Sequence, residues 1–260
     1  MRARVNCCLS RATSNREIRR SIDHSGCARL TNWDSDDTVR WAEENFDRMS
    51  GGRSNPRKAP SLKGSSYNYH KMDVDHCYVD MGFRLDKFGE DRAALQMMNA
   101  ILGSGMSSRL FQSVREEKAL VYGIASMVHP YTDAGMFLTF MSSTEENVLE
   151  AIETTASTFR KLKENGLTEG ELTRSRNLLK GSMSRYMEST SHRLERLARV
   201  TMTRGSPESL EDLFAELDAV TEEDVMRVAE KILNPKEFNI SILGNEVKAM
   251  KDFSVDQLDF

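Results

Sequence analysis

The segment LGSGMSSRLFQSVREEKALVY, which runs from Leu102 to Tyr122, decides the fold. Two glycines near its start, Gly103 and Gly105, end the helical spacing of the preceding residues, because glycine is a poor helix former. The segment lacks the Lys-Ser/Thr ending of a phosphate-binding loop. We therefore interpret the glycines as a tight connection between two helices, the second of which leads into a strand that contains Tyr122.

The residues on either side extend this pattern of helices and strands. Apolar and polar residues alternate through 77–83, which is typical of a strand. Further strands are predicted at 120–127, 134–141 and 238–243. Most of 143–233 has the spacing of helices. This order predicts an α+β fold, with an antiparallel or mixed sheet and helices packed on one of its faces.

Short capping sequences predict where the later helices begin. A capping box places a Ser or Thr three residues before an acidic side chain, so that each satisfies the other's backbone amide. A Ser followed by Pro is a second start signal. The predicted starts are the boxes Ser143-Thr-Glu-Glu146, Thr168-Glu-Gly-Glu171 and Thr221-Glu-Glu-Asp224, and the pair Ser206-Pro207.

The segment 102–122 resembles the most recognisable part of the C-terminal half of the M16 (pitrilysin, or insulinase) zinc-peptidase family. Members of that family read close to LG-G-GMSSRLFQ-x-x-RE-x-x-GL-x-Y there. The resemblance continues to about Gly244 and covers roughly 32–245. It implies a LuxS/MPP-like metallohydrolase fold and a role in peptide-bond hydrolysis.

The zinc motif of the family is absent from the sequence. In His-x-x-Glu-His, two His on one helix face ligate the metal and the Glu acts as general base. No histidine of the chain begins or ends this motif, or begins His-Glu-x-x-His: His24, His70, His76, His129 and His192. We therefore expect no zinc on this chain, and the resemblance places zinc in a partner half.

Two arrangements come close to a metal site. His192-Arg-Leu-Glu-Arg196 has Arg196 where the second ligand would stand, and a guanidinium cannot ligate zinc at neutral pH. We interpret His192 and Glu195 as part of a solvated helix face. His70 and His76 would lie ~20 Å apart on a continuous strand, at ~3.3 Å per residue, and are interpreted as the polar face of an edge strand.

Arg115 and Tyr122 are the candidate substrate-binding residues. From the residues alone they would be an exposed helix charge and a strand aromatic. In M16 peptidases, the matching Arg and Tyr reach from the C-terminal half toward substrate at the zinc of the other half. An arginine offers a planar fork of donors and a tyrosine one O–H, which suit the oxygen that gains charge when water attacks a carbonyl.

Ala119 departs from the family pattern, which has glycine before the Leu of GL-x-Y. If this position requires a positive φ, alanine is strained there. The strand that enters Tyr122 would then be displaced.

Composition narrows the function classes. Hydrophobic residues make up 39% of the chain and charged residues 29%, and no apolar run approaches the ~18–20 residues that span a bilayer. The net charge of −4 argues against nucleic acid as a partner. Of four cysteines, only Cys77 lies in the globular part. The chain therefore has no disulfide framework, and a reducing compartment, the cytoplasm, is expected.

The first residues differ in charge from the rest. Residues 1–31 carry seven Arg and two acidic residues, a net charge of +5. They fit either a disordered leader or a transit peptide to the mitochondrial matrix. The expected order along the chain is a basic leader (1–31), the closing helix of a missing or truncated preceding unit (32–50, with VRWAEENF), a linker (51–68), the main α+β domain (69–246) and a tail (247–260).

Three hypotheses about function follow. In the first, the chain is the non-zinc-binding half of an M16-type metallopeptidase, works on peptide substrates in a heterodimer with a His-x-x-Glu-His subunit, and is inactive alone. In the second, it is a catalytically inactive structural or interaction subunit. In the third, it is a fragment of a longer two-half peptidase. An unpaired half would expose an apolar patch, which favours self-association.

Overall fold

The structure is a computed structural model. It describes residues 35–47, 64–85, 91–131, 133–245, 247, 250, 253–258 and 260. The predicted leader, 1–31, lies outside the described residues. In chain order the elements are α3 (Ser35–Phe46), β1 (Ser66–Lys71), β2 (Cys77–Leu85), α4 (Arg92–Gly103), η2 (Phe111–Glu116), β3 (Val121–Pro130), β4 (Gly135–Ser143), α5 (Val148–Asn165), α6 (Glu171–Tyr186), α7 (Thr190–Arg204), α8 (Leu210–Ala219), α9 (Glu222–Ile232), η3 (Pro235–Glu237), β5 (Phe238–Gly244) and η5 (Val255–Gln257).

The chain divides into two compact units. The first contains Met1–Pro56 and Lys180–Ala215, and the second contains Arg57–Leu179 and Glu216–Phe260. Helices α6 and α8 carry residues of both. None of the helices in the described ranges is long and apolar enough to cross a bilayer.

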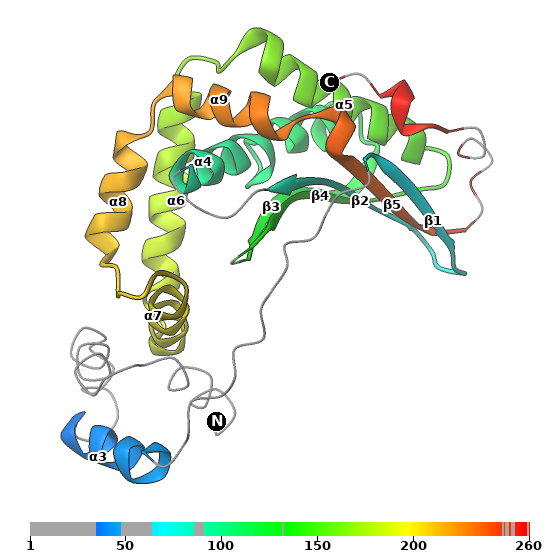
Figure 1. Ribbon diagram of the computed structural model, residues 1–260. Helices are drawn as coiled ribbons and strands as arrows, with labels where there is room; N and C mark the ends of the chain where they lie inside the picture. Colours follow the sequence, from blue (N-terminus) through cyan, green and yellow to red (C-terminus); the bar gives the residue numbers. More distant parts are fainter. Residues whose placement is uncertain are drawn as a thin grey trace. The chain divides into compact units, whose positions relative to one another are not determined.

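The second unit contains a mixed sheet of five strands, in the order β1-β5-β2-β4-β3 (Figure 1). β1 runs parallel to β5, and the other neighbouring pairs are antiparallel. The prediction of an α+β fold with a mixed sheet is confirmed.

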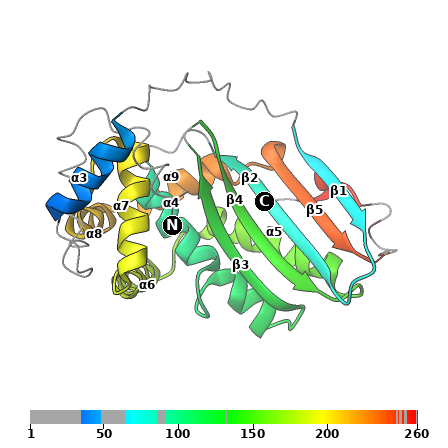
Figure 2. The same cartoon turned by 90° about the horizontal axis from the view of Figure 1, so that it is seen from below.

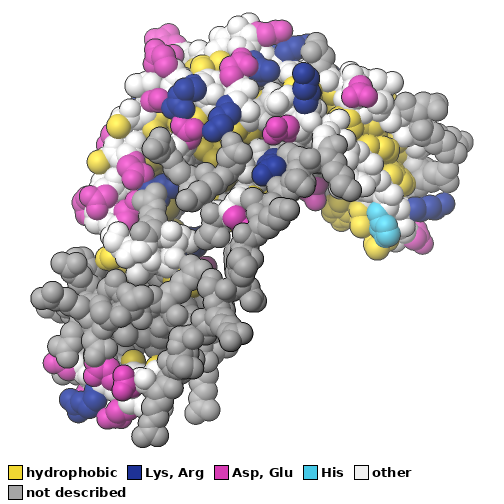
Figure 3. Space-filling model, viewed as in Figure 1, with side chains coloured by type: hydrophobic (Ala, Val, Ile, Leu, Met, Phe, Trp, Pro, Cys, Tyr) yellow, Lys and Arg dark blue, Asp and Glu magenta, His cyan; other side chains and the backbone are white. Residues whose placement is uncertain are grey.

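The strands give the sheet two different faces. Alternate residues of β2 are buried against the helices, whereas Tyr78 and Asp80 between them are exposed. In Figure 2 the strands face the viewer and α4 and α5 lie behind them. Figure 3 shows acidic and basic side chains interspersed over the helical layer at the top of the view. The described helices of the second unit thus cover one face of the sheet and leave the other open.

Five phenylalanines form the centre of the core between the sheet and the helices. The ring of Phe83, on β2, lies 5.1 Å from Phe238, 5.5 Å from Phe260 and 5.7 Å from Phe159, centroid to centroid. Phe137, on β4, lies 6.2 Å from Phe83. These spacings are those of favourable aromatic pairs. The C-terminal residue therefore packs in the core together with residues far from it in sequence.

The helix start predicted at Ser143 is wrong because this residue belongs to the preceding strand. Ser143 is the last residue of β4, where it pairs with Cys77 of β2. Its buried hydroxyl donates to the Leu120 carbonyl at 2.6 Å. The helix begins later, at Val148. A serine that closes a strand and one that caps a helix look alike in sequence.

The start of α8 is also displaced from its predicted position. The helix begins at Leu210, and the capping side chain is that of Ser209, which accepts from the Asp212 amide at 3.0 Å. Ser206-Pro207 lies before it. By contrast, the capping box of Thr221 at the start of α9 is confirmed, with both reciprocal hydrogen bonds present.

Candidate functional site

The first part of the site is the wide helical turn η2, over Phe111–Glu116. Its hydrogen bonds span five residues, as from the Glu117 amide to the Gln112 carbonyl at 2.9 Å, so it is a π-helix. Val114 is buried beneath it, whereas Arg115 is exposed with its guanidinium carbon 4.9 Å from the centroid of the Phe111 ring. π-helical turns often occur at functional sites.

Ala119 turns the chain out of this helix. Its φ is 53°, and it is the only non-glycine residue with positive φ in the part of the chain that the structure describes. The Ala119 and Leu120 amides donate to the carbonyls of Arg115 and Val114, at 3.1 and 3.0 Å. This resembles the paired bonds of a left-handed helix cap. The condition that the sequence raised for this position, a positive φ, is met by an alanine.

Tyr122 lies at an irregularity in β3. Val121 pairs with Ser143 and Gly123 with Ser142, so Tyr122 is an extra residue with no partner on β4. A β-bulge of this kind re-aims a side chain. The Tyr122 side chain is 57% exposed.

The His76 ring supports Tyr122 from the loop before β2. The ring centroids of the two residues are 4.4 Å apart, at an angle of 41°. The His76 Nδ1 atom is buried and has no hydrogen-bond partner in the structure. His76 and His70 are not on one continuous strand, because β1 ends at Lys71 and β2 begins at Cys77. The interpretation of His76 as part of the polar face of an edge strand is therefore wrong, and the sequence did not reveal its contact with Tyr122.

Arg115 and Tyr122 thus lie on consecutive elements, joined through the left-handed Ala119. Both side chains are exposed. Among the described residues no hydrogen bond or ion pair holds the Arg115 guanidinium. Both groups are therefore able to donate to a molecule that this unit does not itself provide.

A hollow of about 560 Å³ lies on the open face of the sheet, and Gly123, the residue after Tyr122, lines it. Its walls come from three neighbouring strands and are mainly apolar. The lining residues are Tyr78, Val79 and Asp80 of β2, Gly123 and Met127 of β3, and Leu138, Phe140, Met141 and Ser142 of β4.

Arg109, inside the segment that decides the fold, has a structural role that the sequence did not reveal. Its Nε and one terminal nitrogen donate to the two carboxylate oxygens of Glu171 at 2.8 and 2.7 Å, and the same terminal nitrogen donates to the Gly166 carbonyl at 2.7 Å. Both charged side chains are mostly buried. The pair holds the start of η2 against the turn between α5 and α6.

The pKa of the Glu171 carboxyl is lower than the ordinary value for a glutamate. Burial alone would raise its pKa, but hydrogen bonds from Arg109 and Thr168 outweigh that effect and lower the pKa. The Thr168 amide donates to Glu171 at 2.9 Å, which is half of the predicted capping box. The carboxylate therefore stays charged and links two elements.

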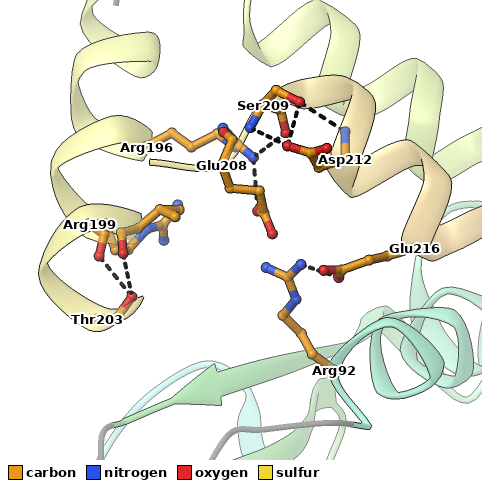
Figure 4. Close-up of polar contacts among 9 residues, drawn as sticks. Arg92, Arg196, Arg199, Thr203, Glu208, Ser209, Asp212 and Glu216 are labelled. Carbon is orange, nitrogen blue, oxygen red and sulfur yellow. Dashed lines mark hydrogen bonds and ion pairs between the residues drawn. The ribbon is translucent and has the colours of Figure 1, made fainter. Parts of the chain in front are cut away.

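In His192-Arg-Leu-Glu-Arg196, the arginine that stands in place of a second zinc ligand forms an ion pair inside the first unit. Arg196 is 9% exposed, and it donates to the Glu208 carbonyl at 2.7 Å and to the Glu208 carboxylate at 3.1 Å (Figure 4). Glu195 is exposed, as expected for a solvated face. His192 is half-buried instead, with its ring stacked on Tyr186 at 4.0 Å.

No described residues form a metal centre of the kind that the family implies for its catalytic half. Across the described ranges, no three His, Cys, Asp or Glu side chains are grouped so that they could hold a metal ion. Catalytic zinc usually takes three such ligands. Cys77 offers no nucleophile either, because burial and then the charge of Glu145 raise the pKa of its thiol.

The fold and these side chains define a class of domain that presents exposed donors beside an open sheet face. Residues 27–179, more than half of the chain, match the family described as the peptidase M16 inactive domain. An uncharacterised zinc protease of Mycobacterium tuberculosis (strain H37Rv) is 30% identical over 219 residues, which are 82% of this chain and 50% of that protein. An uncharacterised zinc protease of Bacillus subtilis is 34% identical over 181 residues, 67% of this chain and 44% of that protein. The chain belongs to the M16 peptidase family, as a C-terminal domain of its inactive type.

Solved structures agree on the fold. A peptidase M16 inactive domain from Pseudomonas fluorescens has a TM-score of 0.72 and 24% identity, over 82% of this chain and 51% of that one. A chain in complex III from Candida albicans has a TM-score of 0.73 and 18% identity, over 87% of this chain and 55% of that one. The present chain spans about half the length of the curated relatives that it matches.

Proposed function

We propose that this chain acts as the non-zinc-binding half of an M16-type metallopeptidase. A partner that carries His-x-x-Glu-His would supply zinc, the metal-bound water and the general base. The present chain would supply a wall of the closed chamber, formed by its open sheet face, and two donors to the substrate, Arg115 and Tyr122.

The exposure of the two donors is the observation that carries the proposal. Tyr122 is the unpaired residue of a bulge and is 57% exposed. An exposed tyrosine contributes little to the stability of the fold, because most of its stabilising effect comes from burying the ring. Arg115 is exposed at the end of a π-helix. A hydrogen-bond donor that is held in place stabilises an acceptor most when that acceptor develops negative charge in the transition state.

A division of labour between the two halves follows from the chemistry. The zinc held by the partner would activate water, and the peptide carbonyl oxygen would gain negative charge on attack. The Tyr122 hydroxyl offers one directional donor to that oxygen, and the Arg115 guanidinium offers a fork of donors to neighbouring carbonyls of the same peptide. Neither group needs to touch the metal.

The proposal is tested by mixing separately purified subunits. We expect the present chain alone to cleave no peptide, and a mixture with a His-x-x-Glu-His subunit to cleave a quenched fluorescent peptide in a chelator-sensitive manner, faster than the two subunits do separately. Strong, chelator-sensitive cleavage by the isolated chain would refute the proposal. A stable complex without cleavage would favour the structural or interaction role instead.

A further inference from the structure

Tyr122 has one aromatic neighbour within the described ranges, the ring of His76. The two ring centroids are 4.4 Å apart, whereas the closest pairs in the phenylalanine core are 5.1 Å apart. At so short a separation the faces of the two rings overlap. Among the described residues no hydrogen bond holds the Tyr122 hydroxyl, and the side chain is 57% exposed. The contact with His76 therefore restrains a side chain that is otherwise largely open to solvent.

The two rings meet across the end of a strand. His76 precedes β2 and Tyr122 belongs to β3, and β4 lies between these strands, so their backbones are about 10 Å apart at ~4.8 Å per strand. Ser143, the last residue of β4, pairs with Cys77 on one side and with Val121 on the other. His76 and Tyr122 are the sequence neighbours of these two partners. The contact therefore forms where β4 ends and where the bulge adds a residue to β3.

The backbone around His76 is fixed by β5 and by the loop after it. Cys77 is fully buried, and a Cβ built on Gly244 would lie 2.8 Å from its Sγ atom. The Asn245 side-chain amide donates to the Val74 carbonyl at 3.0 Å. The His76 Nδ1 atom is buried without a hydrogen-bond partner among the described residues. The ring is thus held by packing rather than by a hydrogen bond from Nδ1.

We infer that His76 is a positioning residue for Tyr122, whose ring it restrains so that the hydroxyl is directed toward the substrate. The inference rests on the proposed function, because it extends the role that Tyr122 has there. An exposed tyrosine has several staggered rotamers at χ1, and a change of rotamer moves the hydroxyl by several ångströms. A hydrogen bond to the substrate requires the hydroxyl oxygen within about 3 Å of its acceptor. Loss of the His76 ring therefore lowers the fraction of molecules in which Tyr122 is in place.

The first test measures the contact in the chain alone by NMR. With isotope-labelled tyrosines, the ring signals of Tyr122 are identified by their loss in Tyr122→Phe. We expect His76→Leu, which fills the space without an aromatic face, to move these signals toward those of a free tyrosine. His76→Phe keeps the ring current and should keep the signals displaced. The control His70→Ala, at an exposed residue of β1, leaves them unchanged.

The second test measures cleavage by the assembled pair. We expect His76→Leu to lower kcat about fivefold and to change KM by less than about twofold, and His76→Phe to restore most of the loss. In the Tyr122→Phe background, which has no hydroxyl to position, His76→Leu should have no further effect. A role confined to the stability of the sheet would instead lower activity equally in both backgrounds.

Three outcomes decide between the inference and the proposed function. Tyr122 signals that are the same in the wild type and in His76→Leu overturn the inference. An equal loss of kcat in both backgrounds, or no loss in either, also overturns it. Displaced Tyr122 signals that depend on His76, together with a mixture that cleaves no peptide, overturn the proposed peptidase role and support the restraint of Tyr122 by His76.

Discussion

Ala119 is the residue at which the site departs most from ordinary backbone geometry. A φ of 53° brings the alanine Cβ close to its own carbonyl oxygen, at a cost of about 1–2 kcal/mol. The turn nevertheless forms, because the buried Val114 and Leu120 on either side of it join η2 to β3. The neighbouring structure therefore imposes the conformation on this residue.

Replacing this alanine with glycine is expected to stabilise the chain. Ala119→Gly relieves the steric strain but raises the entropy of the unfolded chain, so we predict a net gain of about 0.5–1 kcal/mol in the free energy of unfolding. Urea denaturation measures it. The matched control is Glu117→Gly, at a residue with φ of −75°, which should lose about 0.5–1 kcal/mol. Loss of stability in Ala119→Gly would contradict the account.

The Arg109–Glu171 pair predicts a pH dependence of stability. The lowered pKa of Glu171 means that the folded chain binds fewer protons there than the unfolded chain. Its contribution is therefore fully present above the unfolded pKa of about 4.3 and is lost as the pH falls through the folded pKa.

This dependence is measured by urea denaturation at several pH values. Glu171→Gln should lower the free energy of unfolding by about 2–4 kcal/mol at pH 7, because Arg109 is left without its charged partner. The difference from the wild type should shrink in acid. Glu153→Gln serves as the exposed control and should change stability little. A difference that is constant with pH would show that the charge of Glu171 does not matter.

Gly103 sets how closely α4 approaches the sheet. A Cβ on Gly103 would lie 2.3 Å from the Ser126 hydroxyl and 2.4 Å from the Ser126 amide on β3. The Ser126 hydroxyl also donates to the Asn99 side chain at 2.8 Å. Gly103 is thus needed because the backbones of α4 and β3 approach closely at this point. It also lies at the end of α4.

Gly103→Ala is therefore expected to destabilise the second unit. The added methyl group must push α4 away from β3, and we predict a loss of about 3 kcal/mol in thermal or urea denaturation. Gly181→Ala, inside α6, meets only the mobile end of a side chain at 3.5 Å and should be neutral or stabilising by up to about 1 kcal/mol. Equal effects of the two substitutions would contradict the proposed close approach.

The start of α8 offers a test between two serines. Ser209→Ala removes the side chain that accepts from the Asp212 amide, so we predict a loss of about 1 kcal/mol. Ser206→Ala should change stability by less than about 0.5 kcal/mol. Circular dichroism during denaturation compares the two. A larger loss in Ser206→Ala would support the capping site predicted from the sequence instead.

The sequence predicted elements well where their signals are local. The alternation of 77–83 and the capping box at Thr221 correspond to β2 and α9, because side-chain period and capping depend on neighbours in the chain. The starts of α5 and α8 were misplaced, because strand pairing at Ser143 and the choice between two serines depend on tertiary contacts. The family pattern raised a positive φ at Ala119 only as a condition, and the bulge at Tyr122 had no local signal.

The site was only partly predictable for the same reason. Arg115 and Tyr122 could be named from their positions in the quoted segment. The packing of His76 on Tyr122 and the joining of Asp80 with Phe140 bring together residues that are 46 and 60 positions apart. Arg109 looked like an ordinary helix residue until its partner, Glu171, was located 62 positions away. Such pairs arise from strand register and loop packing, which one sequence does not reveal.

At the scale of the whole molecule, the second unit is a layered domain whose charged helical side and open sheet face differ in character. The open face carries exposed apolar side chains, including Tyr78, Met136 and Phe140. Exposed apolar surface of this kind marks sites of interaction. The open face is therefore the surface on which the proposed pairing with a second half would be tested.

The most direct test of the central claim compares four variants in the assembled pair. Arg115→Ala and Tyr122→Phe should each lower kcat/KM for a peptide by at least about tenfold, because each removes a donor to the reacting peptide. The controls are Arg160→Ala, on α5, and Tyr131→Phe, at a tyrosine that is 56% exposed at the far end of the β3–β4 hairpin. Both controls should keep wild-type kcat/KM. Full activity in Arg115→Ala and Tyr122→Phe would contradict the assignment of these residues as substrate contacts.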